Sequence, residues 1–92
     1  MAKSAFKAKI YGVVQGVGFR YFTARQAAVY DVTGYVKNLP DGTVETVAEG
    51  EKDVLENFLK VLKKGPYGSV VENIDIDWQQ PANRHQDFRI TY

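Results

Sequence analysis

The sequence predicts an α+β sandwich in which two helices cover one face of an antiparallel sheet. Three observations favour this fold: segments of alternating apolar and polar residues, two segments with helical spacing of apolar residues, and a connection typical of a β-hairpin. In chain order these segments read βαββαβ, followed by an additional short C-terminal strand.

The first half of the chain contains the first three predicted elements. Residues 6–11 alternate between apolar and polar side chains, which predicts a strand. Residues 19–30 predict a helix whose apolar side includes Phe22 and Val29 beside several alanines. Residues 32–38 alternate again and predict a second strand. We expect residues 1–5 to form a loose N-terminal segment.

The second half begins with a hairpin connection at residues 39–42 (LPDG), where Asp-Gly supplies the positive φ that a tight turn needs. A strand is predicted over residues 44–49 and a helix from residue 51 to the Gly65-Pro66 stop. Alternation predicts a further strand around residues 74–78 and a last one at residues 88–92. We expect Trp78 and the phenylalanines to lie in the core. Two helices on one face of such a sheet form a ferredoxin-like fold.

Length and composition restrict the function. The chain has 92 residues, which is one domain, and 12 basic against 11 acidic residues give a net charge of +1. This balance does not favour nucleic acid or an anionic membrane as a partner. Cysteine is absent, so thiolate chemistry is excluded. With no apolar leader segment, we expect a cytoplasmic monomer.

The segment from Gly12 to Arg20 has three glycines within seven residues and leads directly into a predicted helix. Such a loop can point several N–H groups at an anion, and Arg20 adds a fork-shaped cation. A plain turn is the alternative interpretation. Two better-known phosphate motifs are excluded: Tyr21 replaces the third glycine of the dinucleotide fingerprint, and no Gly-Lys-Ser/Thr tripeptide occurs.

Asn38 is the second candidate site residue. A right-handed crossover makes the first two strands parallel, so their C-terminal ends lie at the same edge of the sheet. One end carries the glycine loop and Arg20, and the other carries Asn38. Asn38 has either a role in the turn or a role in holding a ligand in the cleft.

Two long segments, residues 14–20 (VQGVGFR) and 34–45 (GYVKNLPDGTVE), resemble the acylphosphatase family. The resemblance continues through Gly65-Pro66 to the ending FRITY and covers nearly the whole chain from residue 6. It implies hydrolysis of the carboxyl–phosphate bond of acyl phosphates without a metal or cofactor. The small-molecule substrate would be the only partner.

The resemblance also implies roles for individual residues. Arg20 matches the family's phosphate-binding arginine, and Asn38 matches the asparagine that orients the attacking water. The backbone amides of the cradle match those of Gln15, Gly16, Val17, Gly18 and Phe19. Position 13, which is often basic in the family, is Val13 here.

Other candidates carry less weight. His85, the only histidine, and the alternating Asp75 and Asp77 are expected to be solvated rather than catalytic. No cluster has the spacing of metal ligands, so no metal site is predicted.

Two other functions are compatible with a fold of this kind. An RNA-recognition module is disfavoured because the third predicted strand lacks aromatic residues on which bases could stack. A non-catalytic phosphate-binding regulatory domain stays open as the alternative to a free-standing enzyme.

Overall fold

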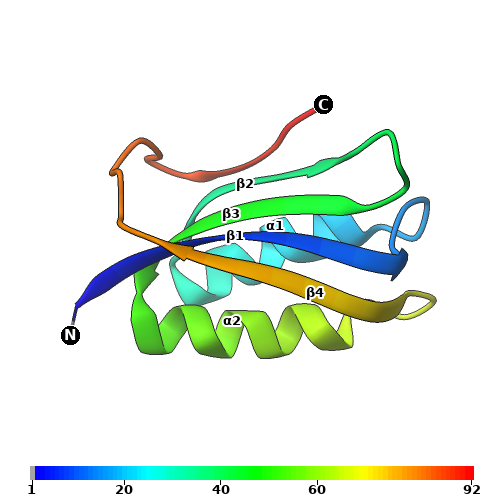
Figure 1. Cartoon of the computed structure of the whole chain (residues 1–92), viewed down its shortest axis with the longest axis horizontal. Helices are drawn as coiled ribbons and strands as arrows, with labels where there is room; N and C mark the ends of the chain where they lie inside the picture. Colours follow the sequence, from blue (N-terminus) through cyan, green and yellow to red (C-terminus); the bar gives the residue numbers. More distant parts are fainter. Residues whose placement is uncertain (1) are drawn as a thin grey trace.

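In a computed structural model that describes residues 2–92, seven elements follow the predicted order (Figure 1). They are β1 (Lys3–Val13), α1 (Phe19–Tyr30), β2 (Thr33–Asn38), β3 (Val44–Glu51), α2 (Lys52–Lys64), β4 (Val70–Gln79) and β5 (Phe88–Ile90). Both helices lie on the same side of the sheet (Figure 1). The ferredoxin-like prediction is confirmed.

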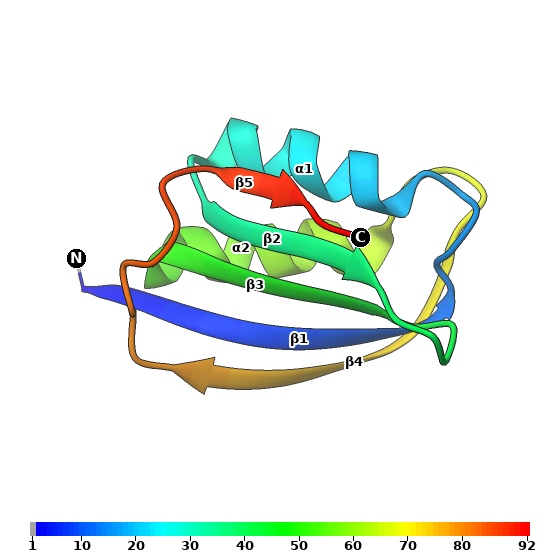
Figure 2. The same cartoon turned by 90° about the horizontal axis from the view of Figure 1, so that it is seen from above.

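The five strands are ordered β4-β1-β3-β2-β5 (Figure 2). β1 pairs antiparallel with β3 and β4, and β2 pairs antiparallel with β3, so β1 and β2 are parallel with β3 between them, as predicted. β5 pairs parallel with β2 at the sheet edge. The complete sheet is therefore mixed, and its antiparallel part comprises the first four strands.

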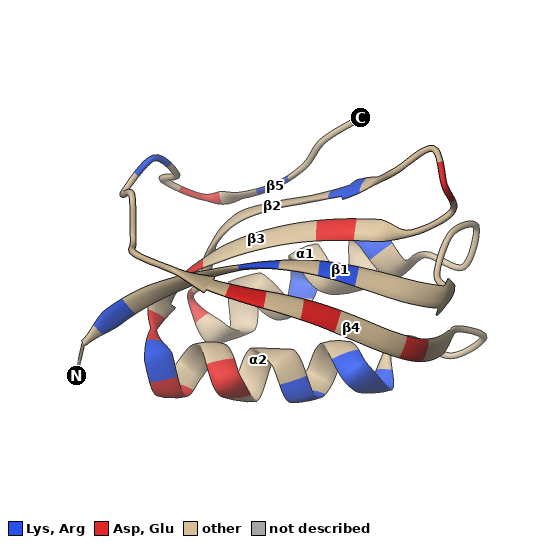
Figure 3. Cartoon of the chain, in the orientation of Figure 1, with Lys and Arg blue, Asp and Glu red and all other residues tan. Residues whose placement is uncertain are grey.

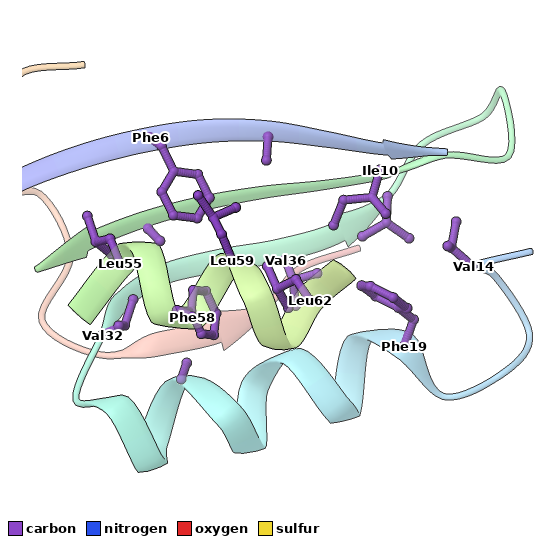
Figure 4. Packing of buried hydrophobic residues seen from close by; sticks show 14 residues of the cluster. Phe6, Ile10, Val14, Phe19, Val32, Val36, Leu55, Phe58, Leu59 and Leu62 are labelled. Atoms are coloured by element: carbon purple, nitrogen blue, oxygen red, sulfur yellow. The ribbon is translucent and has the colours of Figure 1, made fainter. Parts of the chain in front are cut away.

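The core lies between the sheet and the two helices (Figure 4). Alternation along β1 buries Phe6, Ala8 and Ile10. The helical spacing of α2 buries an apolar stripe that faces them: Leu55, Phe58, Leu59 and Leu62. The distribution of charged residues along α2 also matches the helix dipole, because Asp53 lies in its first turn and lysines lie in its last turn (Figure 3).

The buried stripe of α1 differs from the predicted one. The residues that α1 buries are Phe19, Thr23 and Ala27, whereas Val29 is 74% exposed. Thr23 is tolerated because its hydroxyl donates to the carbonyl of Phe19 at 2.9 Å. The small side chains of Thr23 and Ala27 let α1 pack closely on the sheet. Phe22 also packs against the core, so the prediction is wrong for Val29 only.

The N-terminal segment also differs from the prediction. Lys3, Ser4 and Ala5 extend β1 and pair with the end of β3, and Ala5 is 2% exposed. The expectation of a loose segment is therefore wrong for residues 3–5, because the sheet supplies partners that local sequence does not reveal. Residue 1 lies outside the described residues.

Trp78 is not a core residue, contrary to the prediction. It lies on edge strand β4, is 38% exposed, and packs edge-on against Phe6 with 5.5 Å between ring centroids. The Lys52 ammonium lies 4.8 Å from the Trp78 ring centroid. An edge strand has a neighbouring strand on one side only. Alternation therefore identifies the face of the sheet on which Trp78 lies, but not how far its side chain is buried. Phe6, Phe19 and Phe58 are buried as predicted.

Candidate functional site

The loop between β1 and α1 brings backbone donors to one end of the sheet. Gly16 and Gly18 have φ values of 75° and 77°, in the left-handed region where glycine is favoured. Gly18 is also the N-cap residue of α1, and no side chain of residues 2–92 caps the helix. The first N–H groups of α1 are thus free of side-chain partners, and the first turn has no acidic residue to oppose an anion.

The second part of the site is the end of β2. Asn38 is the final residue of this strand and pairs with Val44 at the start of β3. The Oδ1 atom of Asn38 is buried, and it has no hydrogen-bond partner among the described residues. A buried acceptor without a partner carries a free-energy cost of about 1–3 kcal/mol. The turn interpretation, in which side-chain hydrogen bonds fix Asn38, therefore does not account for this oxygen.

A single hollow of about 90 Å³ joins the two parts. It is lined by Val14, Gly16, Gly18, Phe19, Arg20, Tyr21 and Asn38. The loops that follow β1 and β2 lie at the same end of the sheet, as the topology predicts (Figures 1 and 2). Five of the seven predicted site residues line this hollow, and their roles stay predictions.

Two predicted site residues do not line the hollow. Val17 is partly buried and packs against the hydrophobic core. The side chain of Gln15 points to the β2–β3 hairpin, where its Nε2 atom donates to the carbonyls of Leu39 and Thr43. The prediction for both residues concerned their backbone N–H groups. Sequence reasoning missed the side-chain role of Gln15, because its partners lie 24 and 28 residues away.

Arg20 has no carboxylate within ion-pair distance among residues 2–92. Its guanidinium lies over the ring of Tyr92, with 5.0 Å from Cζ to the ring centroid. Tyr92 is 90% exposed, and Tyr21 on the rim of the hollow is 61% exposed. Arg20 thus keeps its charge available to an anion. Sequence reasoning missed Tyr92, because its place beside Arg20 depends on the parallel pairing of β5 with β2, which no local pattern reveals.

The hairpin that follows Asn38 is held by charge-assisted contacts. Asp41 Oδ1 accepts from the N–H of Thr43 at 3.1 Å and from its hydroxyl at 2.5 Å, and Asp41 Oδ2 lies 2.9 Å from Lys9 Nζ. The contact with the Lys9 ammonium, and next the hydrogen bonds from Thr43, hold the pKa of the Asp41 carboxyl well below its ordinary value. Gly42 has a φ of 91°, as the Asp-Gly turn predicts. The hairpin is therefore ordered by its own residues and by β1.

The open face of the sheet carries an ion-pair network. Glu45 accepts from the Tyr35 hydroxyl at 2.7 Å and lies near Lys7 and Lys37. Burial opposes ionisation of Glu45, but these three partners outweigh it and lower its pKa. Burial, and then the Glu45 contact, raise the pKa of Tyr35 to about 12. These groups lie on the face of the sheet opposite the helices, and their contacts connect neighbouring strands to one another.

The other candidates lie away from the hollow. His85 packs against the Tyr35 ring with centroids 5.9 Å apart and lines a different cavity, of about 270 Å³. That cavity is larger than the hollow, but neither Arg20 nor Asn38 lines it. Asp75 and Asp77 are exposed on β4, as expected.

Two further properties concern membranes and metals. In the part of the chain that the structure describes, neither helix is long and apolar enough to cross a bilayer. Within residues 2–92 there is also no group of three or more acidic or histidine side chains that could hold a metal ion.

Comparisons with known proteins place this geometry in context. The family model described as Acylphosphatase matches residues 6–90. A protein described as an acylphosphatase from Salinibacter ruber is 47% identical to this chain over 83 residues, which cover 90% of this chain and 87% of that protein.

Solved structures, including that of an acylphosphatase, also resemble this chain. The crystal structure of acylphosphatase from Bacillus subtilis aligns with a TM-score of 0.94 at 37% identity, covering 97% of this chain and 99% of the other. Full-length HypF, in a phosphate- and nucleotide-bound form, aligns with a TM-score of 0.86 at 30% identity. That alignment covers 99% of this chain but 12% of the HypF chain.

Proposed function

This chain belongs to the acylphosphatase family, and from that premise we propose that it hydrolyses acyl phosphates to a carboxylate and inorganic phosphate. Family and fold together support this activity. The observation that carries the proposal is the hollow lined by the glycine loop, Arg20 and Asn38, whose buried Oδ1 has no hydrogen-bond partner among residues 2–92.

The phosphoryl group binds at the loop between β1 and α1. Backbone N–H groups of residues 15–19 surround its oxygens, and the Arg20 guanidinium pairs with them. Phosphoryl transfer passes through a loose transition state whose charge is spread over the equatorial oxygens. Donors held by a fixed loop and a helix N-terminus stabilise that charge without reorganising during the reaction.

Asn38 orients the attacking water. Its buried Oδ1 has no partner in the described part of the chain and can accept a hydrogen bond from the attacking water. Placing this water in line with the leaving group lowers the entropic part of the barrier. The proton that the water releases goes to a phosphate oxygen of the substrate, so the mechanism needs no histidine or carboxylate base.

The leaving group explains why so few residues suffice. An acyl phosphate expels a carboxylate, whose conjugate acid has a pKa of about 4, so it departs without being protonated. The positive charge that the reaction requires comes from Arg20 and the loop dipoles. We therefore propose that the reaction depends on neither a metal nor a cofactor.

The size of the hollow restricts what it can enclose. Pockets that enclose whole small molecules measure roughly 300–1,000 Å³, whereas this hollow measures about 90 Å³. It therefore encloses a phosphoryl group and leaves the acyl group at the rim, beside the exposed Tyr21. Discrimination between acyl groups is accordingly weak.

Hydrolysis of benzoyl phosphate in the presence of a chelator tests the proposal. We expect rapid turnover that excess chelator does not reduce. A folded protein that binds inorganic phosphate but does not hydrolyse benzoyl phosphate would contradict it. Turnover that a chelator abolishes would contradict the metal-independent mechanism alone.

The alternative is a non-catalytic phosphate-binding domain. It is favoured by the match to a small part of the HypF chain, which shows that this fold also occurs within a longer protein. Phosphate binding without hydrolysis of any acyl phosphate would identify this case.

The monomeric state and the cytoplasmic location stay predictions, and gel filtration tests the monomeric state.

A further inference from the structure

The side chain of Gln15 connects the two loops that form the site. Gln15 follows β1 in the glycine loop, and its Nε2 atom donates to the carbonyl oxygens of Leu39 and Thr43, each at 2.8 Å. These two residues flank the tip of the β2–β3 hairpin, and Leu39 directly follows Asn38. The bridge therefore reaches the hairpin one residue from the proposed water-orienting group.

The two carbonyls form the base of the hairpin loop. The N–H of Leu39 donates to the carbonyl of Thr43 at 2.9 Å, and the N–H of Gly42 donates to the carbonyl of Leu39 at 3.2 Å. Each oxygen thus uses one lone pair within the hairpin and offers the other to Gln15. A single amide group with two N–H donors satisfies both carbonyls and fixes the hairpin against the glycine loop.

Few side chains can form this bridge. Glutamate and methionine have nearly the shape of glutamine, but ionised glutamate and methionine donate no hydrogen bond. Asparagine has the two donors but is one methylene shorter. Of these four side chains, only glutamine supplies two donors at this length, so the bridge is a specific polar contact and not a general packing contact.

We propose that Gln15 is a positioning residue, which sets the position of Asn38 relative to the phosphate-binding loop. This inference rests on the proposed function and adds a side-chain role to a residue whose backbone N–H belongs to the cradle. The backbone N–H remains when the side chain is changed. Loss of the bridge therefore misplaces the attacking water more than it weakens phosphate binding.

A merely structural role for Gln15 predicts a different result. Loss of two hydrogen bonds from a partly buried site would then lower the thermal stability and leave the turnover of the folded enzyme unchanged. The kinetic constants distinguish the two roles, because kcat reports the position of the water, and inhibition by inorganic phosphate reports the cradle.

The test compares Gln15→Met with Gln79→Met, a matched change at an exposed glutamine on β4. We expect Gln15→Met to lower kcat about 10-fold or more while the inhibition constant of inorganic phosphate changes less than about 2-fold. We expect Gln79→Met to match wild type in both. Gln15→Leu serves as a second uncharged variant without donors if Gln15→Met does not fold.

A double-mutant cycle with Asn38→Ala shows whether Gln15 acts through Asn38. In the Asn38→Ala background, Gln15→Met should change kcat less than about 2-fold, because the group that it positions is gone. Independent, multiplicative effects would overturn the proposal, as would wild-type kcat in Gln15→Met. A wild-type protein that hydrolyses no acyl phosphate would instead overturn the proposed function, and this inference with it.

Discussion

The guanidinium of Arg20 lies over the aromatic ring of Tyr92, with 5.0 Å between Cζ and the ring centroid. The contact exists because β5 runs parallel to β2, and the N–H of Thr91 donates to the carbonyl of Val36 at 2.9 Å. The chain end is thus carried to the edge of the sheet that holds the site. A cation over an exposed ring gains about 0.5–1 kcal/mol. The contact therefore leaves the positive charge of Arg20 unneutralised.

Replacement of Arg20 tests the main electrostatic contribution. We expect Arg20→Gln to lower kcat/KM for benzoyl phosphate by about 10³-fold or more, because arginines that stabilise phosphoryl transfer contribute on this scale. The control is Arg25→Gln, which removes an exposed arginine from the same helix. Near wild-type turnover by Arg20→Gln would remove Arg20 from the mechanism.

Replacement of Asn38 separates turnover from stability. We expect Asn38→Ala to lower kcat about 10²-fold, since a polar group that preorganises the reaction is lost. Its free energy of unfolding should stay within about 1 kcal/mol of wild type, because the change removes a buried oxygen that has no partner among the described residues. Denaturant unfolding and steady-state kinetics measure the two effects.

The control for this prediction is Asn73→Ala, at an exposed asparagine on β4. It should leave both kcat and stability unchanged. If Asn38→Ala lost several kcal/mol of stability in proportion to its loss of activity, Asn38 would be a turn residue rather than a site residue.

Tyr35 makes stability depend on pH in the alkaline range. Its folded-state pKa is about 12, which is above the ordinary value of 10.0, chiefly because of burial and then because of the Glu45 contact. The stabilisation is fully present below pH of about 10 and is lost as the pH rises through about 12. We expect the Tm of wild type to fall more steeply across this window than that of Tyr35→Phe.

Thermal unfolding at several alkaline pH values measures this difference, and the fully exposed Tyr67 provides the control variant Tyr67→Phe. Lysines also titrate in this range, but they are the same in all three proteins, so the difference isolates Tyr35. Parallel Tm curves for wild type and Tyr35→Phe would show that the Tyr35 hydroxyl titrates normally.

Gly34 is the position in β2 where we expect the largest loss of stability. Its φ is 143°, and an added Cβ would lie 1.8 Å from the carbonyl oxygen of Val47 on the neighbouring strand. We expect Gly34→Ala to lower the free energy of unfolding by more than about 3 kcal/mol, because both the backbone conformation and the strand spacing must change. Denaturant unfolding measures the loss.

Gly50→Ala is the matched control on β3. A Cβ at Gly50 would meet its nearest neighbour, Leu55 Cδ2, at 3.8 Å, which is an ordinary van der Waals contact. We expect a change below about 1 kcal/mol. Similar losses at both positions would show that close approach of the strands is not what Gly34 provides.

The pattern of apolar residues predicted the elements well where one face alone is buried. The limits of α1 at Phe19 and Tyr30 are confirmed, and so is the helical spacing of apolar residues in α2. The prediction failed where a neighbouring element decides burial: Val29 is exposed on α1, and Trp78 is exposed on an edge strand. Ala5 is buried because β1 extends further than its alternation suggests.

The sequence by itself determined the order of the elements, the family, and the meeting of Arg20 with Asn38 at one sheet edge. The order follows from local periodicity, the meeting at one sheet edge follows from the handedness of the crossover, and the family is indicated by the resemblance of residues 14–20 and 34–45. Only the tertiary structure decided that Asn38 has an unpartnered oxygen, that Gln15 bridges to the hairpin, and that Tyr92 covers Arg20. Each of these depends on distances between residues far apart in the chain, and chain folding alone sets those distances.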